Sequence, residues 1–229
     1  MIGGALALGA AGWVGWAWLP HLFTPACAWR GPRTGRRLAL TFDDGPDPVW
    51  TPRLLDALGA AGVHATFFLI GERAARVPAL VRRMVDEGHE IGNHSWSHRS
   101  LWLCGPRATA VEIGRAHGRL ADLTGMAPRH FRPPWGMVNA AMFPALRRIG
   151  ERCVFWSIQP EGRRPAPAMR QVEYVLRRAH PGAIVDLHDA EGTPAAPERL
   201  LAAVPALLDG LRARGYALTT VADLLSARG

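Results

Sequence analysis

The sequence predicts a parallel α/β domain built from seven repeated units of one strand and one helix. Short apolar runs alternate with amphipathic stretches from Arg37 to the C-terminus. Glycines follow most of the amphipathic stretches closely, where a helix C-cap belongs. Seven units are one short of a complete eight-stranded barrel, so the pattern alone leaves an incomplete barrel and a doubly wound sheet open.

The predicted strands are short runs bounded by turn residues. They are Leu38–Phe42, His64–Ile70, Glu90–His94, His130–Pro133, Cys153–Ile158, Ala183–His188 and Tyr216–Val221. The predicted helices share apolar residues at helical spacing and are Thr51–Ala61, Val77–Glu87, Ala108–Leu123, Ala140–Ile149, Ala168–Arg178 and Pro197–Arg214. No long linker interrupts the series, which indicates one domain over residues 38–229.

Residues 1–23 contain no charged side chain, a length that fits a membrane-spanning helix or a signal sequence. Ala26-Cys27-Ala28 has the pattern of a signal cleavage site, although no basic stretch precedes the apolar run. We therefore assign residues 1–28 to a membrane or signal segment and residues 29–37 to a linker. A buried amphipathic helix is the alternative. The assignment predicts a membrane-anchored or secreted protein with its domain outside the cytoplasm, although Arg30, Arg33, Arg36 and Arg37 leave the orientation open.

The chain has 229 residues and a net charge of +8, and all of its basic residues are arginine. The arginines are dispersed, with no basic run longer than two, so no nucleic-acid partner is expected. The charge suits an acidic glycan, an anionic envelope polymer or a lipid surface. The three cysteines have neither metal-ligand spacing nor a disulfide framework.

Unusual polar residues follow four of the predicted strands. Asp43 and Asp44 end the first strand, and their mutual repulsion calls for a cation or an arginine nearby, unless they form a solvated turn. His94 and His98 follow the third strand, and a helical turn there would point both imidazoles to one metal ion together with Asp44. Zinc suits this set, as do iron, cobalt and nickel.

Four motifs resemble those of the NodB-homology polysaccharide deacetylases, also called carbohydrate esterase family four. They are Thr41–Gly45, His94–His98, Arg132–Gly136 and Leu187–Asp189, in the family's order, and the similarity runs from Leu38 to Leu225. The resemblance implies a distorted, incomplete (β/α)7-type barrel. It also implies a metal-dependent hydrolase of carbon–nitrogen bonds other than peptide bonds, with peptidoglycan or chitin as typical substrates.

The resemblance assigns a role to each matching residue. Asp43 would be the general base and His188 the general acid, with Arg132 holding Asp43. The metal ligands would be Asp44, His94 and His98. Pro134 and Trp135 would line the substrate groove, and a backbone N–H near Gly45 would help to stabilise the oxyanion. The alternatives are a non-catalytic carbohydrate-binding descendant and an amidohydrolase for a small amide or a lipid-linked sugar.

The sequence departs from the family pattern at two places. The family's Asp-Trp pair after the fifth strand is absent from residues 155–164, and Asp186 replaces the leucine two residues before His188. In the family, the missing aspartate orients the acid histidine. Side chains two apart in a strand share a face, so we expect Asp186 to orient His188 instead. The alternative is that Asp186 pairs with Arg163 or Arg164 and only supports the structure.

Overall fold

A computed structural model describes residues 12–161, 166–190 and 195–226. Among them lies one parallel sheet of seven strands, in the order β5-β4-β3-β2-β1-β6, with β7 paired to β1. The strands are β1 (Arg37–Asp43), β2 (Thr66–Leu69), β3 (Glu90–Asn93), β4 (His130–Phe131), β5 (Arg152–Cys153), β6 (Ile184–His188) and β7 (Ala217–Thr219). From β1 to β5 the strand order follows the chain order, as in a barrel rather than a doubly wound sheet.

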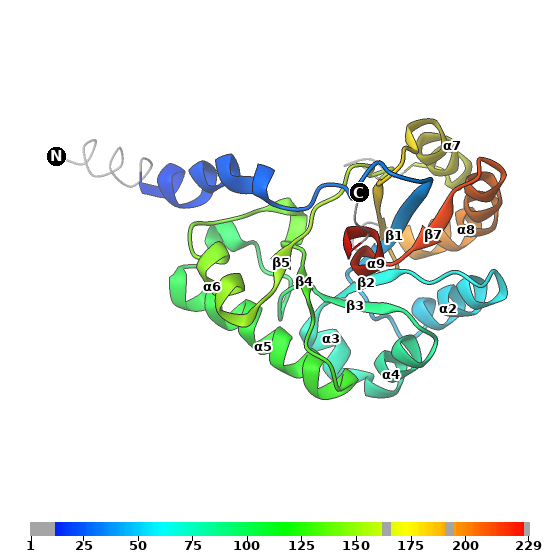
Figure 1. The fold of residues 1–229 in the computed structure, drawn as a ribbon. Helices are drawn as coiled ribbons and strands as arrows, with labels where there is room; N and C mark the ends of the chain where they lie inside the picture. The colour runs from blue at the N-terminus through cyan, green and yellow to red at the C-terminus, as the bar shows by residue number, and fades with distance from the viewer. Residues whose placement is uncertain (1–11, 162–165, 191–194, 227–229) are drawn as a thin grey trace.

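The helices surround the curled sheet (Figure 1). They are α2 (Trp50–Ala60), α3 (Gly71–Arg76), α4 (Pro78–Asp86), α5 (Pro106–Thr124), α6 (Met142–Ile149), α7 (Ala168–Arg178), α8 (Ala196–Ala213) and α9 (Val221–Ser226). Two short 3₁₀ turns, η3 (Leu101–Leu103) and η4 (Pro134–Gly136), lie in the loops after β3 and β4. The seven predicted strands and six predicted helices are all present, within a few residues. The sequence analysis missed α3 and α9, which have only six residues each and show too little periodicity.

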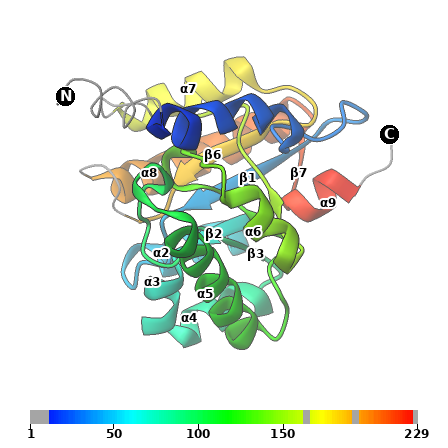
Figure 2. The ribbon, with the colours of Figure 1, turned by 90° about the vertical axis from the view of Figure 1, so that its left-hand side faces the viewer.

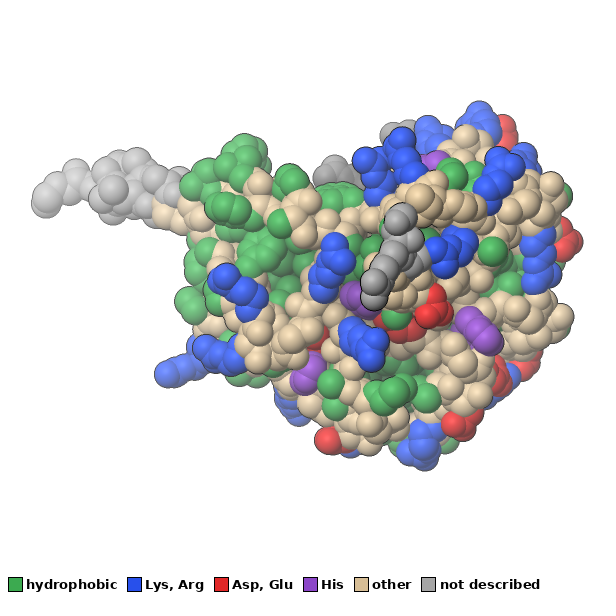
Figure 3. Space-filling model, viewed as in Figure 1, with side chains coloured by type: hydrophobic (Ala, Val, Ile, Leu, Met, Phe, Trp, Pro, Cys, Tyr) green, Lys and Arg blue, Asp and Glu red, His purple; other side chains and the backbone are tan. Residues whose placement is uncertain are grey.

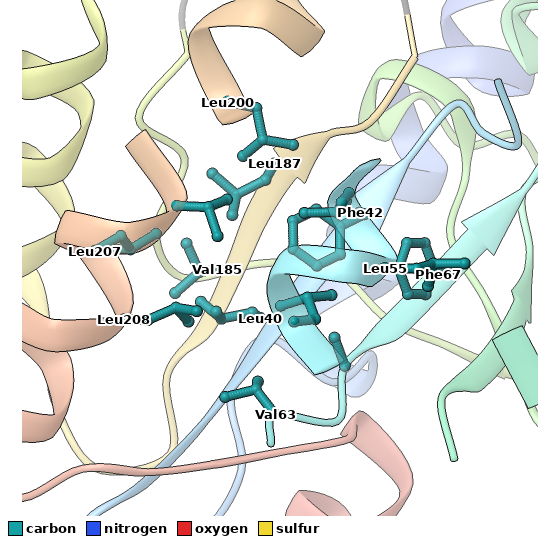
Figure 4. Packing of buried hydrophobic residues seen from close by; sticks show 14 of the residues in the cluster. Leu40, Phe42, Leu55, Val63, Phe67, Val185, Leu187, Leu200, Leu207 and Leu208 are labelled. Carbon is teal, nitrogen blue, oxygen red and sulfur yellow. The ribbon is translucent and has the colours of Figure 1, made fainter. Parts of the chain in front are cut away.

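The main core lies between the central strands and the helices α2 and α8. Leu40 and Phe42 of β1 and Val185 and Leu187 of β6 point toward Leu55, Leu200, Leu207 and Leu208 on these helices (Figure 4). Six of the seven residues of β1 are buried, because this strand has neighbours on both edges and helices on its outer face. The burial explains why β1 reads as a continuous apolar run that ends at the acidic pair.

No eighth strand closes the sheet between β5 and β6 in the part of the chain that the structure describes. Instead, the segment before β1 crosses this seam: Ala28 forms a parallel bridge with Val154, and Arg30 forms an antiparallel bridge with Ala183. Farther along the seam, Ile158 bridges Val185. Strand β5 is therefore shorter than predicted, since Val154 and Ile158 form single bridges at the seam instead of continuing the strand.

The N-terminal segment differs from the predicted membrane-spanning helix. Residues 1–11 lie outside the described part of the chain, and the next turns are a π-helix, η1 (Val14–Trp18), and a 3₁₀-helix, η2 (Leu19–Ala26). None of the helices that the structure describes has both the length and the apolar run that crossing a bilayer takes. Figure 2 shows η1 and η2 on the side of the domain that also carries α5 and α6.

Candidate active site

The predicted site residues converge at the carboxyl ends of the parallel strands. Asp43 is the last residue of β1 and lies in register with His188, the last residue of β6. His94 follows β3 directly, and Arg132 follows β4 directly. The carboxyl ends of parallel strands share one edge, so residues far apart in the sequence meet there.

Asp44, His94 and His98 form a compact set of possible metal ligands. One donor atom from each lies within 4.8 Å of the others. Asp44 Oδ1 is 2.9 Å from His98 Nε2 and 3.5 Å from His94 Nε2. His94 Nδ1 is hydrogen-bonded to the Arg132 carbonyl at 2.8 Å, so its Nε2 is the atom that faces Asp44. Two imidazole nitrogens and a carboxylate oxygen fit zinc and related divalent cations.

The charges at this triad also suit a cation. Burial alone would raise the pKa of Asp44, but hydrogen bonds from His94 and His98 hold the pKa well below its usual range. Burial alone would lower the pKa of His94, but the carboxylates of Asp43 and Asp44 raise it. Neutral imidazoles are needed to bind a metal, so metal binding would release any proton held on His94.

The loop that carries the two histidines is not the helical turn expected from the sequence. Ser95 has a φ of +67° and His98 a φ of +58°, values that no helix contains. Hydrogen bonds hold these conformations: Asn93 Oδ1 accepts the Ser95 N–H at 2.9 Å, and Ser95 Oγ accepts the His98 N–H at 3.1 Å. The shared direction of the imidazoles therefore comes from this loop and not from helical spacing.

Glu112 of α5 holds the same loop from outside. Its two oxygens accept the Ser97 N–H at 2.8 Å and the Ser97 hydroxyl at 2.7 Å. Glu112 is buried, and the neighbouring Arg115 lies over the Trp96 ring at 3.7 Å. The sequence analysis missed Glu112, which is a single acid on an amphipathic helix and carries no motif.

Asp43 is held by a fully buried arginine. Arg132 Nη1 donates to Asp43 Oδ1 at 2.7 Å and to the Thr41 hydroxyl at 2.7 Å. Arg132 Nη2 donates to the Phe155 carbonyl at 3.0 Å, and its guanidinium lies 4.2 Å from the centre of the Phe68 ring. Arg132 therefore fixes the position of the Asp43 carboxylate.

His188 is oriented by Glu161 rather than by Asp186. Glu161 Oε2 lies 2.9 Å from His188 Nδ1. No hydrogen bond joins Asp186 to His188 as expected; the Asp186 carboxylate instead accepts hydrogen bonds from Arg132 at 3.1 Å and Gln159 at 3.0 Å. The alternative partners of Asp186, Arg163 and Arg164, lie outside the described residues. Burial would lower the pKa of His188, but the charge of Asp186 and the Glu161 contact raise it to about 10.

Glu161 could have been found from the sequence. It lies in the stretch after β5 where the family pattern has its aspartate, and it is the one acid between Phe155 and Arg164. The correspondence was missed because the side chain of Glu161 is larger than that of aspartate and its position in the sequence is shifted.

Burial and the charge of Asp43 raise the pKa of Asp186 to about 7, against the opposing charges of His188 and Arg132.

The predicted groove residues surround this cluster. Trp135 is 58% exposed, and its ring centre lies 4.4 Å from that of His98. Pro134 is buried beneath it. A Cβ at Gly45 would lie 2.5 Å from the carboxylate oxygens of Asp189, so only glycine fits there. The Gly45 carbonyl accepts the Ile70 N–H at 2.9 Å, and an oxyanion contact from the backbone here stays a prediction.

Comparisons with known proteins agree with this geometry. A family profile described as polysaccharide deacetylase matches residues 30–154. A peptidoglycan-N-acetylglucosamine deacetylase of Bacillus cereus is 37% identical over 200 residues, covering 86% of this chain and 92% of the relative. A chitooligosaccharide deacetylase of a Bradyrhizobium species is 37% identical over 200 residues, covering 82% and 90%. A crystal structure of a peptidoglycan N-acetylglucosamine deacetylase in complex with an N-oxidanyl-benzamide superposes with a TM-score of 0.83 at 31% identity, covering 92% of this chain and 99% of that one.

Proposed function

Because this chain belongs to the polysaccharide deacetylase family, we propose that it is a metal-dependent hydrolase that removes acetyl groups from the amino sugars of an envelope polysaccharide. One observation carries the proposal. The ligand triad Asp44, His94 and His98 has two further pairs beside it. In one, Asp43 is paired with the buried Arg132, and in the other, His188 is paired with Glu161. Metal-assisted amide hydrolysis uses these three functions: a cation site, a base and an acid.

Asp44, His94 and His98 would hold the divalent cation, for which zinc is our first choice. When bound, such an ion polarises an amide carbonyl and lowers the pKa of water. Asp43, held in place by Arg132, would accept the proton of the attacking water molecule. His188, held through Nδ1 by Glu161, would donate the proton on Nε2 to the departing amine, which is otherwise a poor leaving group.

Trp135 would bind the sugar that carries the acetyl group. Its exposed indole stands next to His98 at the edge of the site. Aromatic faces offer sugar rings a large apolar contact, and the indole N–H adds a hydrogen-bond donor. An envelope polymer as substrate implies that the domain acts outside the cytoplasm. Cell fractionation of the full chain tests this placement.

The proposal is tested by acetate release from N-acetylated chitooligosaccharides and peptidoglycan fragments by the zinc-loaded full chain. We expect acetate release together with one bound zinc ion per chain. His98→Ala should lower both the zinc content and the activity, whereas His64→Ala, which alters an exposed histidine outside the site, should change neither. Zinc binding without acetate release would favour a carbohydrate-binding protein or an amidohydrolase with another substrate.

A further inference from the structure

The N-terminal segment is bound to the domain through one of its sides. Trp16 Nε1 donates to the Cys104 carbonyl at 3.1 Å, and the Trp16 carbonyl accepts the Ala140 N–H at 3.1 Å. Trp13 meets Trp102 edge to face, with ring centres 5.4 Å apart. Ala17 is fully buried. These contacts fix η1 and η2 on the domain and determine which of their side chains face outward.

The outward side of this segment is an apolar surface. It consists of Trp13, Val14, Trp18, Leu19, Leu22 and Phe23, which are 42–67% exposed. Between Gly12 and Trp29 the sequence has no acidic residue and no arginine. Figure 3 shows hydrophobic side chains gathered over this part of the molecule. Single exposed apolar residues are ordinary, but a gathered patch of this kind marks an interaction site.

A cavity of about 690 Å³ lies between this segment and α6. Most of its lining is apolar and comes from the two facing elements, with Leu19 and Phe23 on one side and Phe143 and Leu146 on the other. Arg147, which is exposed, and Glu151, which is buried, also line the cavity. The apolar surface therefore continues inward as a recess whose margin carries a positive charge.

The exposed charged residues that follow the cavity lining along the chain are arginines. Arg147 and Arg148 in the last turn of α6 and Arg152 of β5 are exposed. Glu151, the acid between them, is buried and accepts hydrogen bonds from Asn93. A positive margin complements an anionic surface. A second copy of this chain would bring the same arginines face to face and would be repelled.

We propose that the surface formed by η1, η2 and α6 docks on the interface of an anionic lipid bilayer. Tryptophan is the residue that concentrates at the headgroup level of membranes, and arginines beside it attract anionic headgroups. Leu22 and Phe23, the most exposed of the six apolar side chains of this surface, would enter the acyl region. The proposal concerns binding parallel to the membrane surface and is independent of the proposed activity.

This surface is connected to the loops that form the active site. Trp102, which packs against Trp13, comes four residues after His98. Ala140, which is hydrogen-bonded to Trp16, comes five residues after Trp135. Docking would therefore engage two segments that lead directly into the active-site loops.

Sedimentation of the full chain with sucrose-loaded vesicles tests the proposal. We compare phosphatidylcholine vesicles with vesicles that also contain phosphatidylglycerol. We expect binding to the anionic vesicles that weakens with added salt, since electrostatic attraction to a surface is screened. The double variant Leu22→Ser/Phe23→Ser should need about ten times more lipid or more for half-maximal sedimentation. Arg147→Gln/Arg148→Gln should lose most of the preference for phosphatidylglycerol.

The matched control is Met126→Ser/Met169→Ser, which removes two equally exposed apolar side chains elsewhere and should bind like the parent chain. Circular dichroism verifies that each variant is folded. Three results would overturn the proposal. One is no sedimentation with either vesicle. Another is undiminished sedimentation of Leu22→Ser/Phe23→Ser, which would assign the binding to another part of the chain. The third is a dimer in light scattering that this variant dissociates, which would show that a second copy covers the surface.

Discussion

Glutamine at position 161 would remove the negative charge next to His188 while keeping an oxygen at the same place. In the native protein, Glu161 Oε2 lies 2.9 Å from His188 Nδ1. Burial lowers the pKa of His188, and the charge of Asp186 together with the Glu161 contact raises it to about 10. Glu161→Gln should therefore lower the pKa of the proposed acid and leave the orientation of its ring largely intact.

The size of this shift follows from the contact. A hydrogen bond to a charged group contributes about 1.5–3 kcal/mol, and one pKa unit corresponds to about 1.4 kcal/mol, so the pKa should fall by about 1–2 units. The two side chains are only 20% and 8% exposed, so solvent screens little of the interaction. His188 would still be protonated at neutral pH. The kcat of Glu161→Gln at pH 7 should therefore stay within about tenfold of the parent.

Glu161→Ala removes the orienting contact as well as the charge. Its kcat should fall by about 100-fold at pH 7, which is the low end of what a positioned acid contributes. Glu173→Gln, an exposed acid on α7, is the control for the charge change alone.

The assay is acetate release by the zinc-loaded enzyme as a function of pH, with Glu161→Gln, Glu161→Ala and Asp186→Asn side by side. The descending alkaline limb should move to lower pH in Glu161→Gln by the predicted 1–2 units. If this limb stays in place in Glu161→Gln and moves in Asp186→Asn, then Asp186 supports the acid, and our reasoning from the observed contact is refuted.

Three further predictions concern the base, the histidine loop and a buried acid. Asp43→Asn should keep zinc bound but lower kcat by about 10²- to 10⁴-fold, measured by zinc content and acetate release; loss of zinc would mean that Asp43 is a ligand. Glu112→Ala should weaken zinc binding by about 10- to 100-fold in a chelator competition, and Glu112→Gln should retain most of the affinity; equal affinity in all three proteins would show that the loop needs no support from α5. Burial raises the pKa of Glu151 from its ordinary value of 4.5 to about 8, so folding favours the neutral form. The contribution of this form to stability is fully present below pH 4.5 and is lost as the pH rises through 8. Glu151→Gln should therefore lose less stability than the parent between about pH 5 and pH 8, by up to on the order of 4 kcal/mol in urea unfolding; parallel pH profiles would contradict the assignment.

The sequence predicted the strands, the long helices and the family, because each depends on local periodicity or on a contiguous motif. The ligand residues and the base and acid candidates were also predicted by position, and the structure brings them together. The sequence could not predict which residues pair with the buried polar groups. Asp186 and Arg132 are 54 residues apart, and their contact depends on the curvature of the sheet, which no spacing encodes.

The conformation of the histidine loop could not be predicted from the local sequence pattern either. A spacing of four residues suggests a helical turn, and positive φ values at Ser95 and His98 are rare enough that the pattern argues against them. Contacts from Asn93 and Glu112 stabilise this unusual backbone. The irregular helices η1 and η2 were missed for a similar reason, because Trp16 and Ala17 pack against the domain and determine their course.

The bridges made by Ala28 and Arg30 have a consequence for processing of the chain. Proteolysis after Ala28 would leave the new amine on Trp29 and would detach Ala28, which is 2% exposed and paired with Val154. The cut would also release Cys27, which packs against Cys153 in the same apolar cluster. An enzyme shortened in this way would expose the edges of β5 and β6, which are prone to pair with other chains. Residues 27–30 thus belong to the folding unit, and maturation that preserves it requires a cut ahead of this seam or none.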